Sequence, residues 1–181
     1  MKPAVPLLLA AWIVQIQISA VAAASPNIQV YFSPKGGCTE AVVDALSKAR
    51  STVLVQAYSF TSQPIAKALV DAHRRGVKLQ VILDKNNQTD KYSAATFTQN
   101  YGIPTFIDAR HSIAHNKIII IDARTVLTGS FNFTMQAEES NAENLLIIDD
   151  PTLAAKYMTN WNVHFAHSKP YERKEPAGKQ R

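Results

Sequence analysis

The sequence predicts a single α/β domain in which a mixed, largely parallel central β-sheet is flanked by helices. Three observations predict this fold class. Strand-like and helix-like periods of apolar residues alternate along the chain, breaks containing glycine or proline separate them, and 181 residues that are 46% hydrophobic suffice for one core. We therefore expect one domain over residues 25–168, preceded by a segment at 1–24 and followed by a tail at 169–181.

Residues 1–24 have the composition of a secretory signal peptide. One basic residue precedes an apolar stretch at 4–14, and three alanines at 22–24 supply the small residues of a cleavage site. The alternative is an uncleaved anchor, but Gln15 and Gln17 interrupt the apolar run before it reaches the roughly 18 residues that span a bilayer. We expect an exported protein, periplasmic or secreted, with no stable membrane insertion after cleavage.

Strands and helices alternate through the first half of the domain. A proline and two glycines break the chain after the first strand, and Ser62 is a suitable N-cap for the second helix, which ends before Gly76. The apolar periods predict strands at 28–33, 52–59 and 77–84, and helices at 39–50 and from Ser62 to Gly76. This βαβ pattern indicates a mainly parallel sheet.

The second half is richer in strands. After a polar loop at 85–91 we expect a short helix near 93–100, strands at 105–108, 115–122, 125–131 and 144–149, and a tight turn at 122–124. Pro151 begins a final amphipathic helix that ends near Phe165 and turns Leu153, Tyr157 and Trp161 toward the core. The basic tail at 169–181 contains two prolines and a glycine, so we expect it to be flexible.

Net charge and cysteine content give weaker indications. The formal charge of the whole chain is +5, and removal of 1–24 lowers it by one, so the protein favours polyanionic partners or uses the charge only for solubility. The tail is either solvated or contacts nucleic acid. Cys38 is the only cysteine, which excludes an intrachain disulfide. We expect it to be a small apolar filler near a helix start, the alternatives being pairing between subunits and metal binding.

Four polar residues near a run of isoleucines form the strongest candidate site. In a strand, side chains two residues apart point to the same face, so His115 and Lys117 share one face, as do Ser130 and Asn132 one hairpin later. A histidine nucleophile beside a fixed cation and neutral donors suits attack on a phosphodiester, because the cation and donors stabilise the charged oxygens of the transition state.

Two carboxylates complete the candidate site. Asp122 lies five positions after Lys117, on the opposite strand face, so we expect it to organise the turn at 122–124 or to hold another group. Glu143 precedes the strand at 144–149 and either orients the ring of His115 or is an exposed acid at the strand end.

The other histidines suggest no metal centre. His111 and His115 have the spacing of a helical metal pair, but this stretch is predicted to be a loop entering a strand and has no obvious third ligand. His73, His164 and His167 are most simply surface or packing residues. We expect neither a metal nor a cofactor.

The residues from His115 to Asn132 resemble the signature of the phospholipase D superfamily, His-x-Lys-x4-Asp followed by Gly-Ser-x-Asn, with Asp122 and Gly129 in their places. Further similarity to the small bacterial members extends over most of the domain and includes the segments at 58–61, 75–77, 83–84 and 141–144. The resemblance implies a mixed α/β fold and a metal-independent, two-step hydrolysis through a phosphohistidine.

The resemblance also implies a role for each site residue. Lys117, Ser130 and Asn132 would contact phosphate, and Glu143 would orient the histidine. Superfamily members need two copies of the signature, and this chain has one. We therefore expect a homodimer with one composite site at its interface.

Three functions remain after these observations. The leading one is a non-specific endonuclease acting on DNA, with RNA as a second substrate, by phosphate recognition without base readout. The second is a lipid phosphodiesterase with the same chemistry, which needs an exposed apolar rim that we do not see in the sequence. The third, a non-catalytic nucleic-acid-binding module, is disfavoured because packing alone does not require the intact signature.

Overall fold

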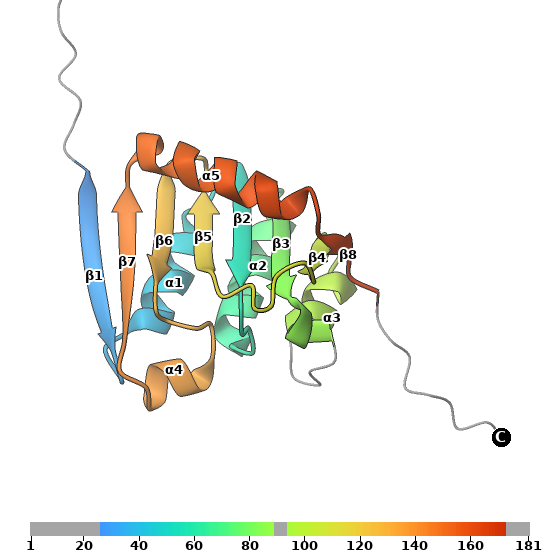
Figure 1. The fold of residues 1–181 in the computed structure, drawn as a ribbon. Helices are drawn as coiled ribbons and strands as arrows, with labels where there is room; N and C mark the ends of the chain where they lie inside the picture. Colours follow the sequence, from blue (N-terminus) through green and yellow to red (C-terminus); the bar gives the residue numbers. More distant parts are fainter. Residues whose placement is uncertain (1–25, 89–93, 173–181) are drawn as a thin grey trace, which may run out of the picture.

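An eight-stranded sheet forms the centre of the molecule and has helices on both faces (Figure 1). The computed structural model describes residues 26–88 and 94–172. The strands are β1 (Asn27–Ser33), β2 (Thr52–Ala57), β3 (Lys78–Asp84), β4 (Thr105–Asp108), β5 (Lys117–Ile121), β6 (Thr125–Gly129), β7 (Glu143–Asp149) and β8 (Lys169–Pro170). The helices are α1 (Cys38–Ser47), α2 (Gln63–Arg74), the 3₁₀ helix η1 (Lys85–Gln88), α3 (Ala94–Asn100), α4 (Met135–Glu139) and α5 (Pro151–Phe165).

The sheet is mixed, as expected, but it is not largely parallel. Its strand order is β1-β7-β6-β5-β2-β3-β4-β8, and only the β2–β3 and β3–β4 pairs are parallel. The remaining neighbours pair antiparallel. The βαβ pattern therefore determines the centre of the sheet, whereas β5, β6 and β7 form a meander and β1 joins its outer edge.

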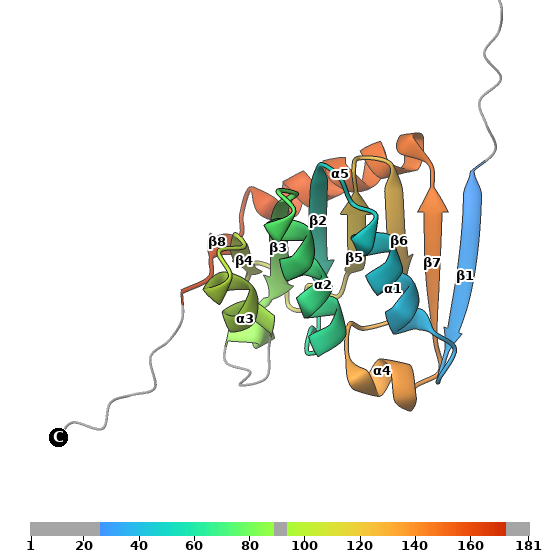
Figure 2. The same ribbon diagram turned by 180° about the vertical axis from the view of Figure 1, so that it is seen from behind.

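Helices α1, α2 and α3 cover one face of the sheet, and α5 crosses the other face (Figures 1 and 2). The larger core lies on the side of α1 and α2 and contains Val55, Leu69 and Ile119. The smaller core lies beneath α5, where Trp161 packs with Ile118 and Ile120 of β5. The final helix therefore buries the face that its apolar spacing predicted. No helix within the described residues is both long and apolar enough to cross a bilayer.

The C-terminal boundary of the domain differs from the expected one. We expected a flexible tail from residue 169, but β8 pairs antiparallel with β4 and Tyr171 is buried. The hydroxyl group of Tyr171 lies 2.7 Å from that of Thr96, and its carbonyl accepts a hydrogen bond from Gln99. These long-range contacts outweigh the local effect of Pro170. The expected signal peptide at 1–24 and the rest of the tail at 173–181 lie outside the described residues.

The short helix α4 was not expected, and it supports the start of α1. The carboxylate of Glu138 accepts hydrogen bonds from the backbone N–H groups of Gly37, at 3.1 Å, and Thr39, at 2.7 Å. It thereby satisfies donors that a helix start leaves free.

Cys38 lies between Gly37 and Thr39 in the sequence and is fully buried. Burial, together with the negative charges of Glu138 and Glu40, raises the pKa of its thiol to about 11. The thiol is therefore protonated at neutral pH, as a packing residue would be.

Candidate functional site

The residues expected to carry the chemistry lie at one edge of the sheet. β5 and β7 begin at this edge, and β2, β3 and β6 end there, at the bottom of Figure 1. The register places Lys117 opposite Ala57, the last residue of β2, and Gly129 opposite Leu145 near the start of β7. Segments far apart in sequence therefore deliver polar side chains to one place.

Lys117 is a buried cation at this edge. It is the first residue of β5, its side chain is buried, and Nζ donates a hydrogen bond of 2.8 Å to the carbonyl of His115. Burial lowers the pKa of its ammonium group, and the negative charge of Glu143 partly opposes this effect. The charge of Glu143 therefore acts on the Lys117 ammonium group. Lys117 is thus a fixed cation with little solvation of its own, which suits binding of a phosphate oxygen.

His115 does not belong to the strand, contrary to the expected strand at 115–122. It lies in the extended loop before β5 and is exposed. Asp84 holds this loop through a 2.7 Å hydrogen bond from the Ala114 N–H group, and the Tyr58 N–H group donates to the Asn116 carbonyl at 3.0 Å. The Tyr58 ring lies 4.6 Å from the His115 ring, centre to centre. His115 is therefore an accessible imidazole on a loop that is held on both sides.

Ser130 and Asn132 follow the end of β6, which is two residues earlier than expected. The strand ends because the N–H groups of Ser130 and Phe131 both donate to the Asn144 carbonyl, at 3.1 and 3.2 Å. Gly129 permits this approach: its φ is 152°, and a Cβ atom there would lie 2.2 Å from the same carbonyl. Ser130 Oγ accepts hydrogen bonds from the backbone and side chain of Asn144.

The amide oxygen of Asn132 is buried and has no hydrogen-bond partner among the residues that the structure describes. Asn132 itself is held through its backbone, because its carbonyl accepts from the Thr134 N–H group at 2.8 Å. Strand alternation therefore does not explain how Ser130 and Asn132 are placed. A turn anchored on Asn144 and Thr134 places them.

Glu143 reaches the same edge from the first position of β7. Its carboxylate accepts a 3.1 Å hydrogen bond from Asn141 Nδ2, and the Asn141 carbonyl in turn accepts from Ser33 Oγ. Within the described part of the chain, no hydrogen bond joins Glu143 to His115. In this arrangement its electrostatic partner is Lys117.

Asp122 is the one signature residue that the structure does not bring to this edge. It follows β5, so it lies a full strand away from Lys117. Its carboxylate accepts hydrogen bonds of 2.7 to 2.9 Å from the N–H groups of Arg50, Ser51 and Thr52 and from Ser51 Oγ. Burial acts to raise its pKa, but these hydrogen bonds dominate and lower it. Asp122 therefore joins the β5–β6 turn to the start of β2, in the organising role expected for it.

Three residues near the edge were not singled out from sequence. Tyr58 contacts His115 and lies with its ring centre 5.3 Å from Lys117 Nζ, Asp84 holds the histidine loop, and Asn144 holds Ser130. Tyr58 directly follows β2, which pairs with β5, and Asp84 ends β3, the next strand along. A polar residue at the carboxyl end of a predicted strand is a signal that the sequence contains. The role of Asn144 depends on the β6–β7 register and has no local signal.

The site is an open edge and not an enclosed pocket. A groove of about 870 Å³ lies elsewhere, between α2 and α3, and none of the candidate residues lines it. The edge is the better candidate for the functional site, because it combines a histidine, a buried cation and neutral donors and the groove does not. An open edge suits a phosphodiester in a large substrate.

Comparison with known proteins agrees with this chemistry. Residues 42–164 match the family model described as cardiolipin synthase, PLD-like domain. A phospholipase D of Rickettsia typhi is 42% identical over 146 residues, covering 77% of this chain and 72% of that protein. A mitochondrial cardiolipin hydrolase of Xenopus laevis is 35% identical over 116 residues, covering 64% of this chain and 55% of that protein.

Two solved structures share the fold. One is Nuc from Salmonella typhimurium, a phospholipase D family member, with a TM-score of 0.79 and 38% identity over 82% of this chain and 99% of that one. The other is NucT from Helicobacter pylori, with a TM-score of 0.76 and 25% identity over 81% of this chain and all of that one. The chain therefore belongs to the phospholipase D superfamily and is a phosphodiesterase of that superfamily.

Proposed function

We propose that the protein is an endonuclease that hydrolyses nucleic acid without a metal, through a phosphohistidine on His115. The observation that carries this proposal is the exposed His115 imidazole beside the buried Lys117 ammonium at an open sheet edge. The basic charge of the chain favours a polyanionic substrate. Phosphate recognition of this kind needs no base readout, so DNA is the expected substrate and RNA a second one.

The reaction has two balanced steps. A ring nitrogen of His115 attacks phosphorus, a phosphorus–nitrogen bond forms, and the bond to the leaving oxygen breaks as a second histidine donates a proton to it. That second histidine then removes a proton from water, whose oxygen attacks phosphorus and releases His115. Lys117, Ser130 and Asn132 stabilise the charge on the phosphate oxygens in both steps.

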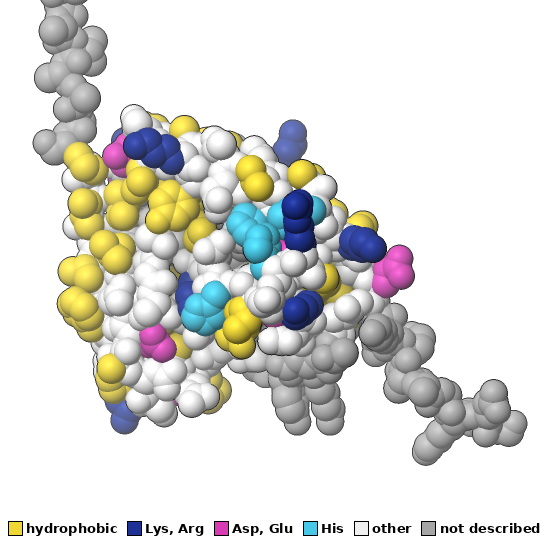
Figure 3. Space-filling model, viewed as in Figure 1, with side chains coloured by type: hydrophobic (Ala, Val, Ile, Leu, Met, Phe, Trp, Pro, Cys, Tyr) yellow, Lys and Arg dark blue, Asp and Glu magenta, His cyan; other side chains and the backbone are white. Residues whose placement is uncertain are grey.

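The second histidine comes from a second copy of the chain in this proposal. β1 exposes Ile28, Val30 and Phe32 on the face of the sheet that α5 crosses, in a part that α5 does not cover. More than half of the surface of each residue is accessible. The register places Leu146 of β7 beside Val30, and Figure 3 shows hydrophobic side chains gathered over these strands. The strip continues to the functional edge, because Phe32 pairs with Asn144.

A second copy is the occupant that this apolar strip favours. An isologous interface uses one surface patch twice, so a strip that reaches the functional edge would bring two such edges together near the axis. Two His115 and two Lys117 side chains could then surround one phosphate. The homodimer also explains why one signature per chain suffices. Export to the periplasm or the medium remains part of the proposal and rests on residues 1–24.

Hydrolysis of a lipid phosphodiester is the alternative, and two observations favour it. The relatives from Rickettsia typhi and Xenopus laevis are named phospholipase D and cardiolipin hydrolase. The structure also has apolar side chains near the site that we did not expect: Ile113, two residues before His115, is 55% exposed, and Met135, three residues after Asn132, is 74% exposed. Such side chains could contact a lipid surface.

One experiment separates the two substrates. Purified protein is incubated with supercoiled plasmid DNA and, separately, with vesicles containing cardiolipin and phosphatidylcholine, all in excess EDTA, with His115→Ala as the matched control. We expect plasmid nicking by the wild-type protein and not by the variant, with little lipid cleavage. Cleavage of lipid alone would establish the alternative, and nicking that needs added Mg²⁺ would contradict the phosphohistidine mechanism.

A further inference from the structure

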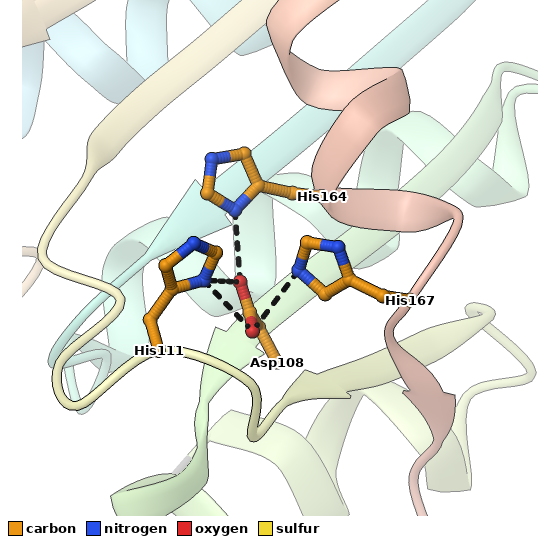
Figure 4. A group of neighbouring side chains, drawn as sticks. All are labelled: Asp108, His111, His164 and His167. Atoms are coloured by element: carbon orange, nitrogen blue, oxygen red, sulfur yellow. Dashed lines mark hydrogen bonds and ion pairs between the residues drawn. The ribbon is translucent and has the colours of Figure 1, made fainter.

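A second cluster of ionisable side chains lies beside the end of α5, next to the loop that presents His115. It consists of Asp108, His111, His164 and His167, which point toward one another (Figure 4). Asp108 is the last residue of β4, His111 lies in the loop after it, His164 belongs to α5, and His167 precedes β8. We expected His164 and His167 to be surface or packing residues; both side chains are largely buried, and tertiary contacts bring both to Asp108.

We propose that these four side chains form a structural binding site for a divalent transition metal of the zinc type. One donor atom from each residue lies within 4.8 Å of all the others. Three imidazoles and one carboxylate are ligands that Zn²⁺ commonly takes in proteins. Four protein ligands complete a tetrahedron and leave no position for substrate, which is typical of structural sites.

The distances are close to those around one tetrahedral ion. The ring nitrogens of His164 and His111 lie 2.8 and 3.0 Å from Asp108 Oδ2, and that of His167 lies 3.3 Å from Oδ1. Ligand atoms on a tetrahedral zinc ion at about 2.0 to 2.1 Å are separated by roughly 3.3 Å. The three ring centres lie 4.8, 5.2 and 5.5 Å apart. Rings bound to one such ion have centres about 5 Å apart, so the three rings already have the spacing that one ion requires.

Burial and hydrogen bonding single out this cluster from ordinary surface histidines. Asp108 is fully buried, and the side chains of His164 and His167 are 13% and 15% exposed. His167 Nε2 is buried and makes no hydrogen bond among the described residues, although it lies 3.3 Å from Asp108 Oδ1. A third imidazole therefore faces a carboxylate that already accepts from two others.

The cluster would also stiffen the loop that presents His115. His111 lies four residues before His115, on the same loop, and its contact with Asp108 joins this loop to the C-terminal end of α5. The Lys85 ammonium group donates a further hydrogen bond to the His111 carbonyl at 3.2 Å. A metal ion here would hold the loop without entering the reaction.

The test is zinc binding by tag-free protein that has been stripped with EDTA and dialysed, measured by titration and by melting temperature, without substrate. We expect one Zn²⁺ per chain and a rise in melting temperature of several degrees, because a ligand that binds only the folded state stabilises it. His111→Ala and His167→Ala should each weaken binding by about 100-fold or more, since loss even of a supporting residue around a metal costs 10- to 100-fold.

His115→Ala is the matched control, because it removes an exposed histidine from the same loop but outside the cluster. It should bind zinc as the wild-type protein does. His111 is 44% exposed, so its replacement should leave the fold intact, which circular dichroism checks. The proposal is overturned if the wild-type protein shows no saturable zinc binding, if both cluster variants bind as tightly as the wild type, or if His115→Ala also loses binding.

Discussion

At the scale of single residues, the sequence predicts the signature residues of the site but not the side chains that hold them in place. The signature identifies His115, Lys117, Ser130 and Asn132, and the structure brings their segments to one edge. The sequence does not reveal that the Tyr58 ring packs against His115 or that Asn144 holds Ser130. Those contacts depend on which strands become neighbours, which local periodicity does not encode.

The first prediction concerns the nucleophile. His115→Ala should lower the rate of phosphodiester cleavage on the order of 10⁴-fold or more, because the proposed phosphohistidine cannot form without this imidazole. Bis(p-nitrophenyl) phosphate is a suitable substrate, because it reports the chemistry regardless of the natural one. The melting temperature should change little, since His115 is exposed. A variant that retains activity within tenfold of the wild type would exclude His115 as the nucleophile.

At the scale of elements, the helices and strands were largely predictable and their pairing was not. Most elements begin and end within a few residues of the expected positions, because local signals mark them. The spacing of apolar residues indicates each element, and Ser62 and Pro151 mark the starts of α2 and α5. The expectation of a largely parallel sheet was wrong, because β5, β6 and β7 form an antiparallel meander and β1 pairs antiparallel with β7, more than a hundred residues away in sequence. α4 and β8 are short and depend on tertiary contacts, so no local pattern predicts them.

The second prediction concerns the joint between β2 and the β5–β6 turn. Asp122→Ala should lower the free energy of unfolding by about 2 to 3 kcal/mol, because it leaves several backbone donors without their charged acceptor. Asp149→Ala is the matched control at the same end of the sheet. It removes an ion pair with Arg124 that is largely exposed, which is worth about 1 kcal/mol or less.

The effect of Asp122→Ala should depend on pH in a defined direction. Because the pKa of Asp122 in the folded protein is lowered below the unfolded value of about 3.9, its stabilisation is complete above pH 4 or so and is lost as pH falls through the folded pKa. Denaturant unfolding at neutral and acidic pH should show the difference between variant and wild type shrinking below about pH 4. If the variant keeps its stability but loses its activity, Asp122 acts in the reaction and not in the joint.

At the scale of the whole molecule, the central claim is that two chains share one site. One chain offers one signature histidine, one buried lysine beside it and an apolar strip that reaches the functional edge. Neither the strip nor the signature alone identifies the partner, but the proposed second copy of the chain would supply both a second signature histidine and a matching apolar surface. Activity should therefore belong to the dimer.

Mixing wild-type and inactive subunits tests directly whether two chains share one active site. Wild-type and His115→Asn chains are unfolded, mixed in equal amounts and refolded, and plasmid nicking is compared with that of the same total amount of refolded wild-type protein. Random pairing leaves about a quarter of the dimers with two histidines, so a composite site predicts roughly a quarter of the wild-type activity. Independent sites in each subunit would leave roughly half. A result of one half, or full activity from a chain that sediments as a monomer, would contradict the shared site.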